Sequence, residues 1–225
     1  MKKRLIIAID GPAASGKSTT ARLLAQKLGY VYLDTGAMYR ACALKAERLG
    51  IDLSQKDEIA AMLDALDIEV VLSGHQNTVF LDREDVNEAI RTHEISRLAS
   101  DISAIPAVRY KMVELQRRIA NNGGVVLDGR DIGSFVFPDA EIKFFMVAPP
   151  EVRALRRFKE LQAKGIETDL DTVLKELNKR DLNDSSRALA PLVRTSDAIE
   201  IDTGCLTIEE QVEALYEHVL ERLGV

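Results

Sequence analysis

The chain has 225 residues, of which 46% are hydrophobic, which is enough for one substantial core with inserted subdomains. The formal net charge of -6 argues against a nucleic-acid-binding protein, because such a surface needs a broad field of Lys and Arg. The two cysteines, Cys42 and Cys205, lack His or Cys neighbours at metal-ligand spacing, so neither a zinc site nor a disulfide framework is expected.

The first predicted elements are a strand, a loop and a helix. An apolar run over residues 5–10 stops at Gly11-Pro12, as in a strand buried on both faces. Apolar residues then recur at helical spacing over residues 17–28, and Gly29 follows as a C-terminal glycine. The order repeats with a strand at 30–33 and helices at 38–49 and 59–66.

The pattern changes between residues 68 and 85. Two short apolar segments flank a polar turn, Ser73-Gly-His-Gln-Asn77, which predicts an antiparallel hairpin. Because this hairpin interrupts a series of alternating strands and helices, we expect it to be an insertion.

The second half of the chain returns to alternating strands and helices. Helices are predicted at 95–103, 108–120, 151–163 and 208–223, and strands at 125–127, 142–147 and 198–201. With the two earlier strands this makes five, which predicts a parallel, doubly wound sheet with right-handed crossovers.

The segment Gly11-Pro-Ala-Ala-Ser-Gly16-Lys17-Ser18 matches the phosphate-binding loop G-x-x-x-x-G-K-[ST]. Its glycines let backbone amides close on phosphates, Lys17 can reach the β and γ phosphates, and Ser18 can bind Mg²⁺. An ordinary glycine-rich turn is the alternative. It is disfavoured because the motif lies between a predicted buried strand and a helix.

Charged residues follow two further predicted strands. Arg40 lies in the segment after residues 30–33, and Arg130 and Asp131 lie after residues 125–127. Strand ends in a doubly wound sheet face one crevice, so these side chains are expected to converge there. Singly, each is more often a solvated charge.

A third group is Arg180, Asp184 and Arg187, which would share one face of a helix. Two guanidinium groups around one carboxylate suit an anionic sugar phosphate. The alternative is a surface ion pair, which contributes only ~0.3–0.5 kcal/mol.

Over essentially its whole length the chain resembles the bacterial cytidylate kinase family. The signatures are residues 9–19, 33–40, 128–133, 136–140 and 198–203, together with Arg180-Asp181, Asp184 and Arg187. The resemblance implies an α/β P-loop NTPase fold: a five-stranded parallel sheet with helices on both faces, a small antiparallel insertion and a helical lid. The implied parts are a core (1–62, 104–149 and 181–225), a nucleoside-monophosphate-binding insertion (63–103) and a lid (150–180).

The resemblance also implies transfer of the γ-phosphate of ATP to CMP and dCMP, with Mg²⁺, by a cytoplasmic monomer without nucleic-acid or membrane partners. Residues implied for catalysis are Lys17, Asp128, Arg130 and Arg180. Those implied for ATP and its metal are Gly11, Pro12, Ala13, Ala14, Ser15, Gly16, Lys17, Ser18 (also the metal ligand), Thr19, Arg156 and Arg157. Those implied for CMP are Thr35; Ser100, Arg109 and Asp131 at the base; Asp184 and Arg180 at the ribose; and Arg40, Arg130 and Arg187 at the phosphate.

Several alternatives stay open at this point. Which of Arg153, Arg156 and Arg157 reaches the transferred phosphoryl group is undecided, and UMP, shikimate or another small acceptor could replace CMP. A GTP-dependent switch is suggested by Asn178-Lys-Arg-Asp181, which matches N-K-x-D. That motif should follow a buried strand, whereas the apolar spacing before it is helical.

Overall fold

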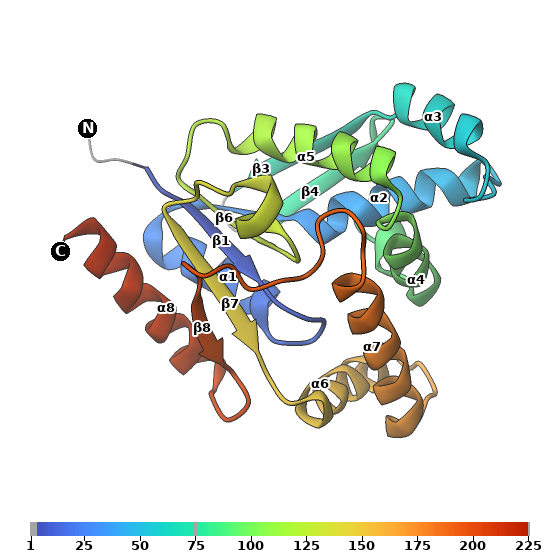
Figure 1. The fold of residues 1–225 in the computed structure, drawn as a ribbon. Coiled ribbons are helices and arrows are strands. Elements are labelled where there is room, and N and C mark those ends of the chain that lie inside the picture. Colours follow the sequence, from blue (N-terminus) through green and yellow to red (C-terminus); the bar gives the residue numbers. More distant parts are fainter. Residues whose placement is uncertain (1–3, 74–75, 225) are drawn as a thin grey trace.

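The computed structural model describes residues 4–73 and 76–224. Its central feature is a parallel sheet with strand order β2-β6-β1-β7-β8 (Figure 1). These strands are β1 (Ile6–Asp10), β2 (Val31–Asp34), β6 (Val125–Gly129), β7 (Ile142–Val147) and β8 (Ile199–Asp202). The predicted five-stranded parallel sheet is confirmed.

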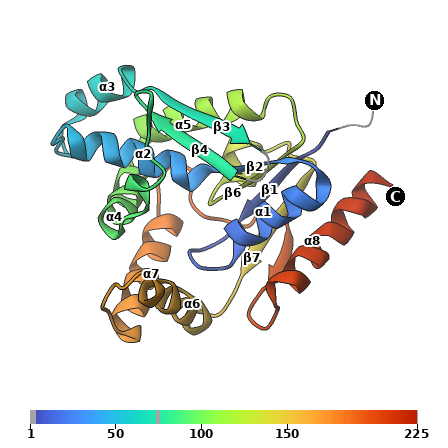
Figure 2. The ribbon, with the colours of Figure 1, turned by 180° about the vertical axis from the view of Figure 1, so that it is seen from behind.

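Both faces of this sheet are covered, which explains the continuous apolar runs in its strands. Along β1, Ile7 and Ile9 pack in one core with residues of α1 (Lys17–Leu28) and α8 (Ile208–Leu223). Ala8 between them faces a second core, which includes residues of α2 (Thr35–Arg48) and α5 (Pro106–Ala120). Figure 2 shows α1 and α8 together on one side of the sheet.

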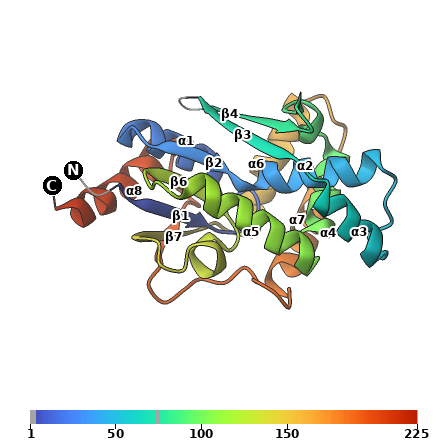
Figure 3. The ribbon, with the colours of Figure 1, turned by 90° about the horizontal axis from the view of Figure 1, so that it is seen from above.

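The predicted hairpin is present as part of a small antiparallel sheet beside α2 (Figure 3). Its strands are β3 (Ile68–Ser73), β4 (Gln76–Leu81) and β5 (Glu84–Asp85). The centre of the predicted turn, residues 74–75, lies outside the described residues. The sequence did not indicate β5, because two residues are too few to show a period.

Side-chain caps set several helix boundaries earlier than the apolar pattern predicts. Helix α2 begins at Thr35 because Asp34 accepts the Ala37 amide at 2.9 Å, and α4 (His93–Ile102) begins where Thr92 accepts the Ile95 amide. These starts are marked by the caps and not by an apolar period, so the sequence places them too late. The remaining short elements are α3 (Lys56–Asp64), the 3₁₀ turn η1 (Ala89–Arg91) and the π-helical turn η2 (Ile132–Val136).

Helices α6 (Pro150–Ala163) and α7 (Leu170–Ser185) form a hairpin beyond the carboxyl ends of the strands (Figure 1). They share a small apolar core of Ala154, Leu161, Val173 and Leu177, on which Ala13 of the phosphate-binding loop also packs. Helix α7 runs unbroken through position 180, where the lid is expected to end. Among the helices of the described ranges, none is long and apolar enough to cross a membrane.

Candidate active site

The loop between β1 and α1 can be built only with glycine at two positions. Gly11 has φ 150°, and a Cβ there would lie 2.2 Å from the Met146 carbonyl oxygen on β7. Gly16 has φ 94°, and its Cβ would lie 2.8 Å from Oε1 of Gln211 on α8. A side chain at Gly11 would collide with the β7 backbone, and the positive φ of Gly16 would strain any other residue.

Lys17 is the first residue of α1 and is buried under this loop, where its Nζ donates to the Pro12 carbonyl at 2.9 Å. Burial, together with repulsion from Arg130, lowers the pKa of Lys17 to about 7, and attraction from Asp128 opposes that shift. A bound anion would favour the charged amine again. The ammonium group is therefore placed to respond to a phosphate.

Asp128, near the end of β6, contacts Ser18 of the phosphate-binding loop. Ser18 Oγ donates to Asp128 Oδ2 at 2.6 Å, and the Tyr32 hydroxyl donates to Oδ1 at 2.8 Å. Burial and the neighbouring charge of Asp34 raise the pKa of Asp128. A hydroxyl and a carboxylate side by side are oxygen ligands of the kind that Mg²⁺ prefers.

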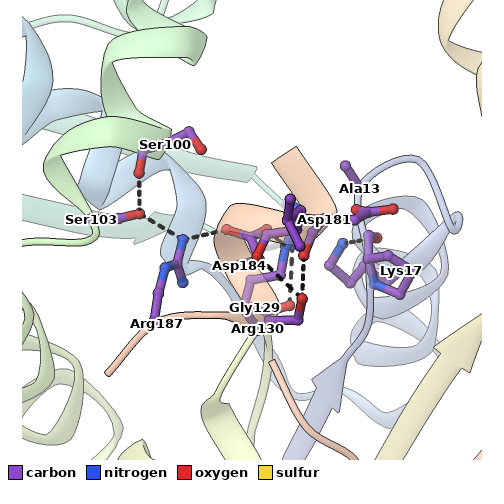
Figure 4. Close-up of polar contacts among 12 residues, drawn as sticks. Ala13, Lys17, Ser100, Ser103, Gly129, Arg130, Asp181, Asp184 and Arg187 are labelled. Carbon is purple, nitrogen blue, oxygen red and sulfur yellow. Dashed lines mark hydrogen bonds and ion pairs between the residues drawn. The ribbon is translucent and has the colours of Figure 1, made fainter. Parts of the chain in front are cut away.

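Asp184 lies between two guanidinium groups (Figure 4). Its Oδ2 accepts from Arg130 Nε at 2.8 Å, and its Oδ1 accepts from Arg187. Sequence spacing predicted Arg180 and Arg187 as the pair. Arg130, which directly follows β6, takes the place of Arg180.

The charges around Asp184 leave a net positive pocket. Burial opposes ionisation of Asp184, but Arg130, Arg187 and Arg180 outweigh it and hold its pKa below its usual value. Burial, with repulsion from Arg130, lowers the pKa of Arg180 to about 10. Its Nε has no hydrogen-bond partner within residues 4–73 and 76–224. Three arginines around one carboxylate favour an anionic ligand.

A second ion pair joins Arg109 of α5 to Asp131, which directly follows Arg130. Both side chains are almost fully buried, and Arg109 Nη1 also donates to the Ser103 carbonyl at 3.1 Å. The hydroxyls of Ser100 and Tyr39 are buried nearby without a partner in the described part of the chain. Unpaired polar atoms next to a fixed ion pair suit a polar ring.

Asp10, the last residue of β1, holds the segment that follows Asp131. Its Oδ1 accepts the Ile132 amide at 2.8 Å and its Oδ2 accepts the Gly133 amide at 2.7 Å. Burial raises the pKa of Asp10 to about 7, although both amide contacts act in the opposite direction. The phosphate-binding strand and the Asp131 turn are thus tied together.

These groups open into one cleft of about 480 Å³. Most of the predicted site residues line it: Ala13, Ala14, Lys17, Ser18, Thr19, Thr35, Arg40, Ser100, Arg109, Asp128, Arg130, Asp131, Arg157, Arg180, Asp184 and Arg187. The predicted residues Gly11, Pro12, Ser15 and Gly16 belong to the loop but are not part of this lining.

The three arginines of α6 point in different directions. Arg153 pairs with Asp181 at 2.6 Å and donates to the Ala13 carbonyl, so it ties the α6–α7 hairpin to the loop. Arg156 lies outside the cleft lining and donates to Thr203 Oγ1 at 3.1 Å. Arg157 lines the cleft and pairs with Glu160.

Sequence reasoning missed several residues of the cleft lining, among them Tyr39 and Ser103. Tyr39 stands inside the segment 33–40 that supports the resemblance, so its place one residue before Arg40 was an available signal. Ser103 is an ordinary helix-end serine in the sequence, and nothing in the pattern distinguishes it.

Known proteins resemble this chain over nearly its full length. The profile of a family described as cytidylate kinase matches residues 7–221. The cytidylate kinase of Caldicellulosiruptor saccharolyticus is 49% identical over 222 residues, which are 99% of this chain and 98% of that protein. The cytidylate kinase of Chloroherpeton thalassium is 52% identical over 222 residues, covering 96% of this chain and 94% of that one.

The fold is also found in a solved structure. The crystal structure of TT1252 from Thermus thermophilus matches with a TM-score of 0.50 and 21% sequence identity, covering 99% of each chain. At that identity the likeness concerns the fold alone. With a family profile and two relatives matching nearly its full length, the chain belongs to the cytidylate kinase family.

Proposed function

We propose that the protein transfers the γ-phosphate of ATP to CMP, giving ADP and CDP. The observation that carries the proposal is one cleft that joins a phosphate-binding loop to an arginine-lined pocket with an ion pair at its end. A donor triphosphate needs the phosphate-binding loop, and an acceptor nucleotide needs the arginine-lined pocket. Membership of the cytidylate kinase family supports CMP as that acceptor.

On the donor side, the loop residues 11–19 hold the phosphates of ATP, and Lys17 contacts the β and γ phosphates. Ser18 and Asp128 are the residues that would hold Mg²⁺ with its water shell, and the ion would supply positive charge to the phosphates. The fit of this pair rests on their contact at 2.6 Å. Arg157 is also assigned to ATP, because it lines the cleft. Arg156 is assigned to ATP because of the family resemblance.

On the acceptor side, Arg40, Arg130 and Arg187 bind the CMP phosphate, and Asp184 with Arg180 binds the ribose. Thr35 lines the floor of this pocket, where its hydroxyl donates to the Asp128 carbonyl at 2.6 Å. Ser100, Arg109 and Asp131 read the base. Cytosine presents an amino donor and a ring acceptor, which suit the Asp131 carboxylate and the Arg109 guanidinium.

The chemistry needs positioning and charge stabilisation. The acceptor is a phosphate whose second pKa is about 6, so it is ionised near neutral pH and no general base is required. Lys17, Arg130 and Arg180 stabilise the negative charge that spreads over the transferred group, and closure around it excludes water. Closure is assigned to the lid at 150–180, moving against the core (1–62, 104–149, 181–225) and the insertion (63–103).

We further infer that dCMP is a second acceptor and that the enzyme is a cytoplasmic monomer without nucleic-acid or membrane partners. Family resemblance supports dCMP, and the acidic composition supports the absence of a nucleic-acid surface. A GTP switch is disfavoured because its N-K-x-D match lies inside α7 and does not follow a strand.

A coupled assay of ADP release tests the proposal with CMP, dCMP, UMP, AMP and shikimate as acceptors. CMP is expected to give the highest kcat/KM, and ATP hydrolysis without an acceptor should be far slower. When GTP replaces ATP in the reaction with CMP, it should be consumed no faster than ATP is consumed with CMP. A preference for shikimate or for no acceptor would refute the assignment.

A further inference from the structure

A closed circuit of hydrogen bonds and ion pairs lines the acceptor pocket, and we call it the acceptor ring. Its members in order are Asp131, Arg109, Ser103, Arg187, Asp184 and Arg130, and the last is bonded to the first through the peptide chain. Five of the members are charged. The neutral one is Ser103, where the ring passes from the ion pair at the base end to the arginines at the phosphate end.

Ser103 makes this connection with two different groups. Its backbone carbonyl accepts from Arg109 at 3.1 Å, and its side-chain Oγ accepts from Arg187 Nη2 at 2.7 Å. The hydroxyl proton is already used, because Oγ donates to the Ser100 carbonyl at 2.8 Å (Figure 4). A hydroxyl has one donor and two lone pairs, so this contact turns a lone pair toward Arg187.

The location of Ser103 explains why its contact with Arg187 matters. It follows α4 directly, is almost fully buried, and lies 84 positions from Arg187 in the chain. Arg187 lies beyond the end of α7, where no helix holds it. Its Nη2 donates both to Asp184 and to Ser103, and these two contacts together orient the guanidinium.

We propose that Ser103 is a positioning residue for the acceptor nucleotide, which acts by fixing the Arg187 guanidinium toward the acceptor phosphate. This inference rests on the proposed function. The Ser103 hydroxyl contacts Arg187 and only the backbone carbonyl of Ser100, while the Ser103 carbonyl serves Arg109. Loss of the hydroxyl alone should therefore weaken phosphate binding and leave base selection intact.

Steady-state kinetics of Ser103→Ala test the assignment. A hydrogen bond to a charged group is lost, so KM for CMP and KM for UMP should both rise about five-fold. The CMP to UMP ratio of kcat/KM and the KM for ATP should stay within about two-fold of the wild type. Ser185→Ala is the matched control, because its exposed hydroxyl also donates to backbone carbonyls, those of Asp181 and Leu182, and has no hydrogen bond to an arginine of the described residues.

A double-mutant cycle then separates positioning from packing. In an Arg187→Met background the Ser103→Ala change should have almost no effect on KM for CMP, because its target is gone. Ser103→Cys, which keeps the size but is a weak acceptor, decides the case if the alanine variant is unfolded.

Three results would overturn the Ser103 assignment: an unchanged KM, the same KM increase in both backgrounds, or a shifted CMP to UMP ratio. They leave the proposed function standing, since the wild type still phosphorylates CMP. A wild type without activity on CMP would overturn both.

Discussion

Arg130 and Asp184 are joined by a hydrogen bond of 2.8 Å that links the end of β6 to the last turns of α7. The two residues are 54 positions apart, and Arg187 meets the other oxygen of the same carboxylate. Asp184 is thus the residue on which the acceptor pocket depends for its shape.

Asp184→Asn should lower the free energy of unfolding at pH 7 by about 3 kcal/mol, because it leaves buried arginines without their counter-ion. The pKa of Asp184 is lowered in the folded protein, so its contribution is present above the unfolded pKa and is lost as pH falls through the folded value. Urea unfolding at pH 7 and near pH 3 measures this. An equal loss at both pH values, or an equal effect of the exposed control Asp139→Asn, would contradict the account.

Lys17→Met should separate activity from stability. Removing a cation that stabilises the transferred phosphoryl group is expected to reduce kcat by about 10³-fold. The nucleotide-free variant should nevertheless melt no lower than the wild type at pH 7, because burial lowers the pKa of Lys17 to about 7.

The difference in stability between the wild type and Lys17→Met should change with pH in a defined direction. Between the folded pKa near 7 and the unfolded pKa of Lys, about 10.4, the unfolded chain binds the extra proton, so wild-type stability rises with pH. The Tm of the wild type should therefore rise relative to that of Lys17→Met from pH 7 to pH 9.

The activity of the variant tests the role of the loop. If Lys17→Met retains activity within a few-fold of the wild type, that role is refuted.

Asp131→Asn should reduce the preference of the enzyme for CMP over UMP. Its carbonyl oxygen can still accept from Arg109, which turns the amide nitrogen, a donor, toward the base. That donor opposes the amino group of cytosine and suits the carbonyl of uracil, and mispaired buried groups can discriminate by up to about 10⁴-fold. The kcat/KM for CMP should fall much more than that for UMP. Equal losses on both acceptors would show that Asp131 has a structural role.

The α6–α7 hairpin should become better protected when both nucleotides bind. It has its own small core and contacts the phosphate-binding loop through Ala13 and Arg153. Hydrogen exchange with a non-hydrolysable ATP analogue and CMP should slow in residues 150–180, with β1 and β6 as internal references. Identical exchange in residues 150–180 with and without ligands would argue against a moving lid.

Much of the fold could be predicted because its signals are local. The apolar runs of β1 and β7 reflect burial on both faces, and the phosphate-binding loop is a contiguous motif between a strand and a helix. The partner of Asp184 could not be predicted, since Arg130 lies 54 positions away in the chain and meets it only in the folded structure. The same holds for Ser103, whose contact with Arg187 leaves no period or motif in the sequence.

The most direct test of the central claim follows the phosphate itself. ATP labelled at the γ-phosphate is mixed with the protein, Mg²⁺ and CMP, and the products are separated. The label should appear in the β-phosphate of CDP, with one ADP formed for each CDP and little free phosphate. Label found mainly as inorganic phosphate, at a rate that CMP does not change, would contradict the account.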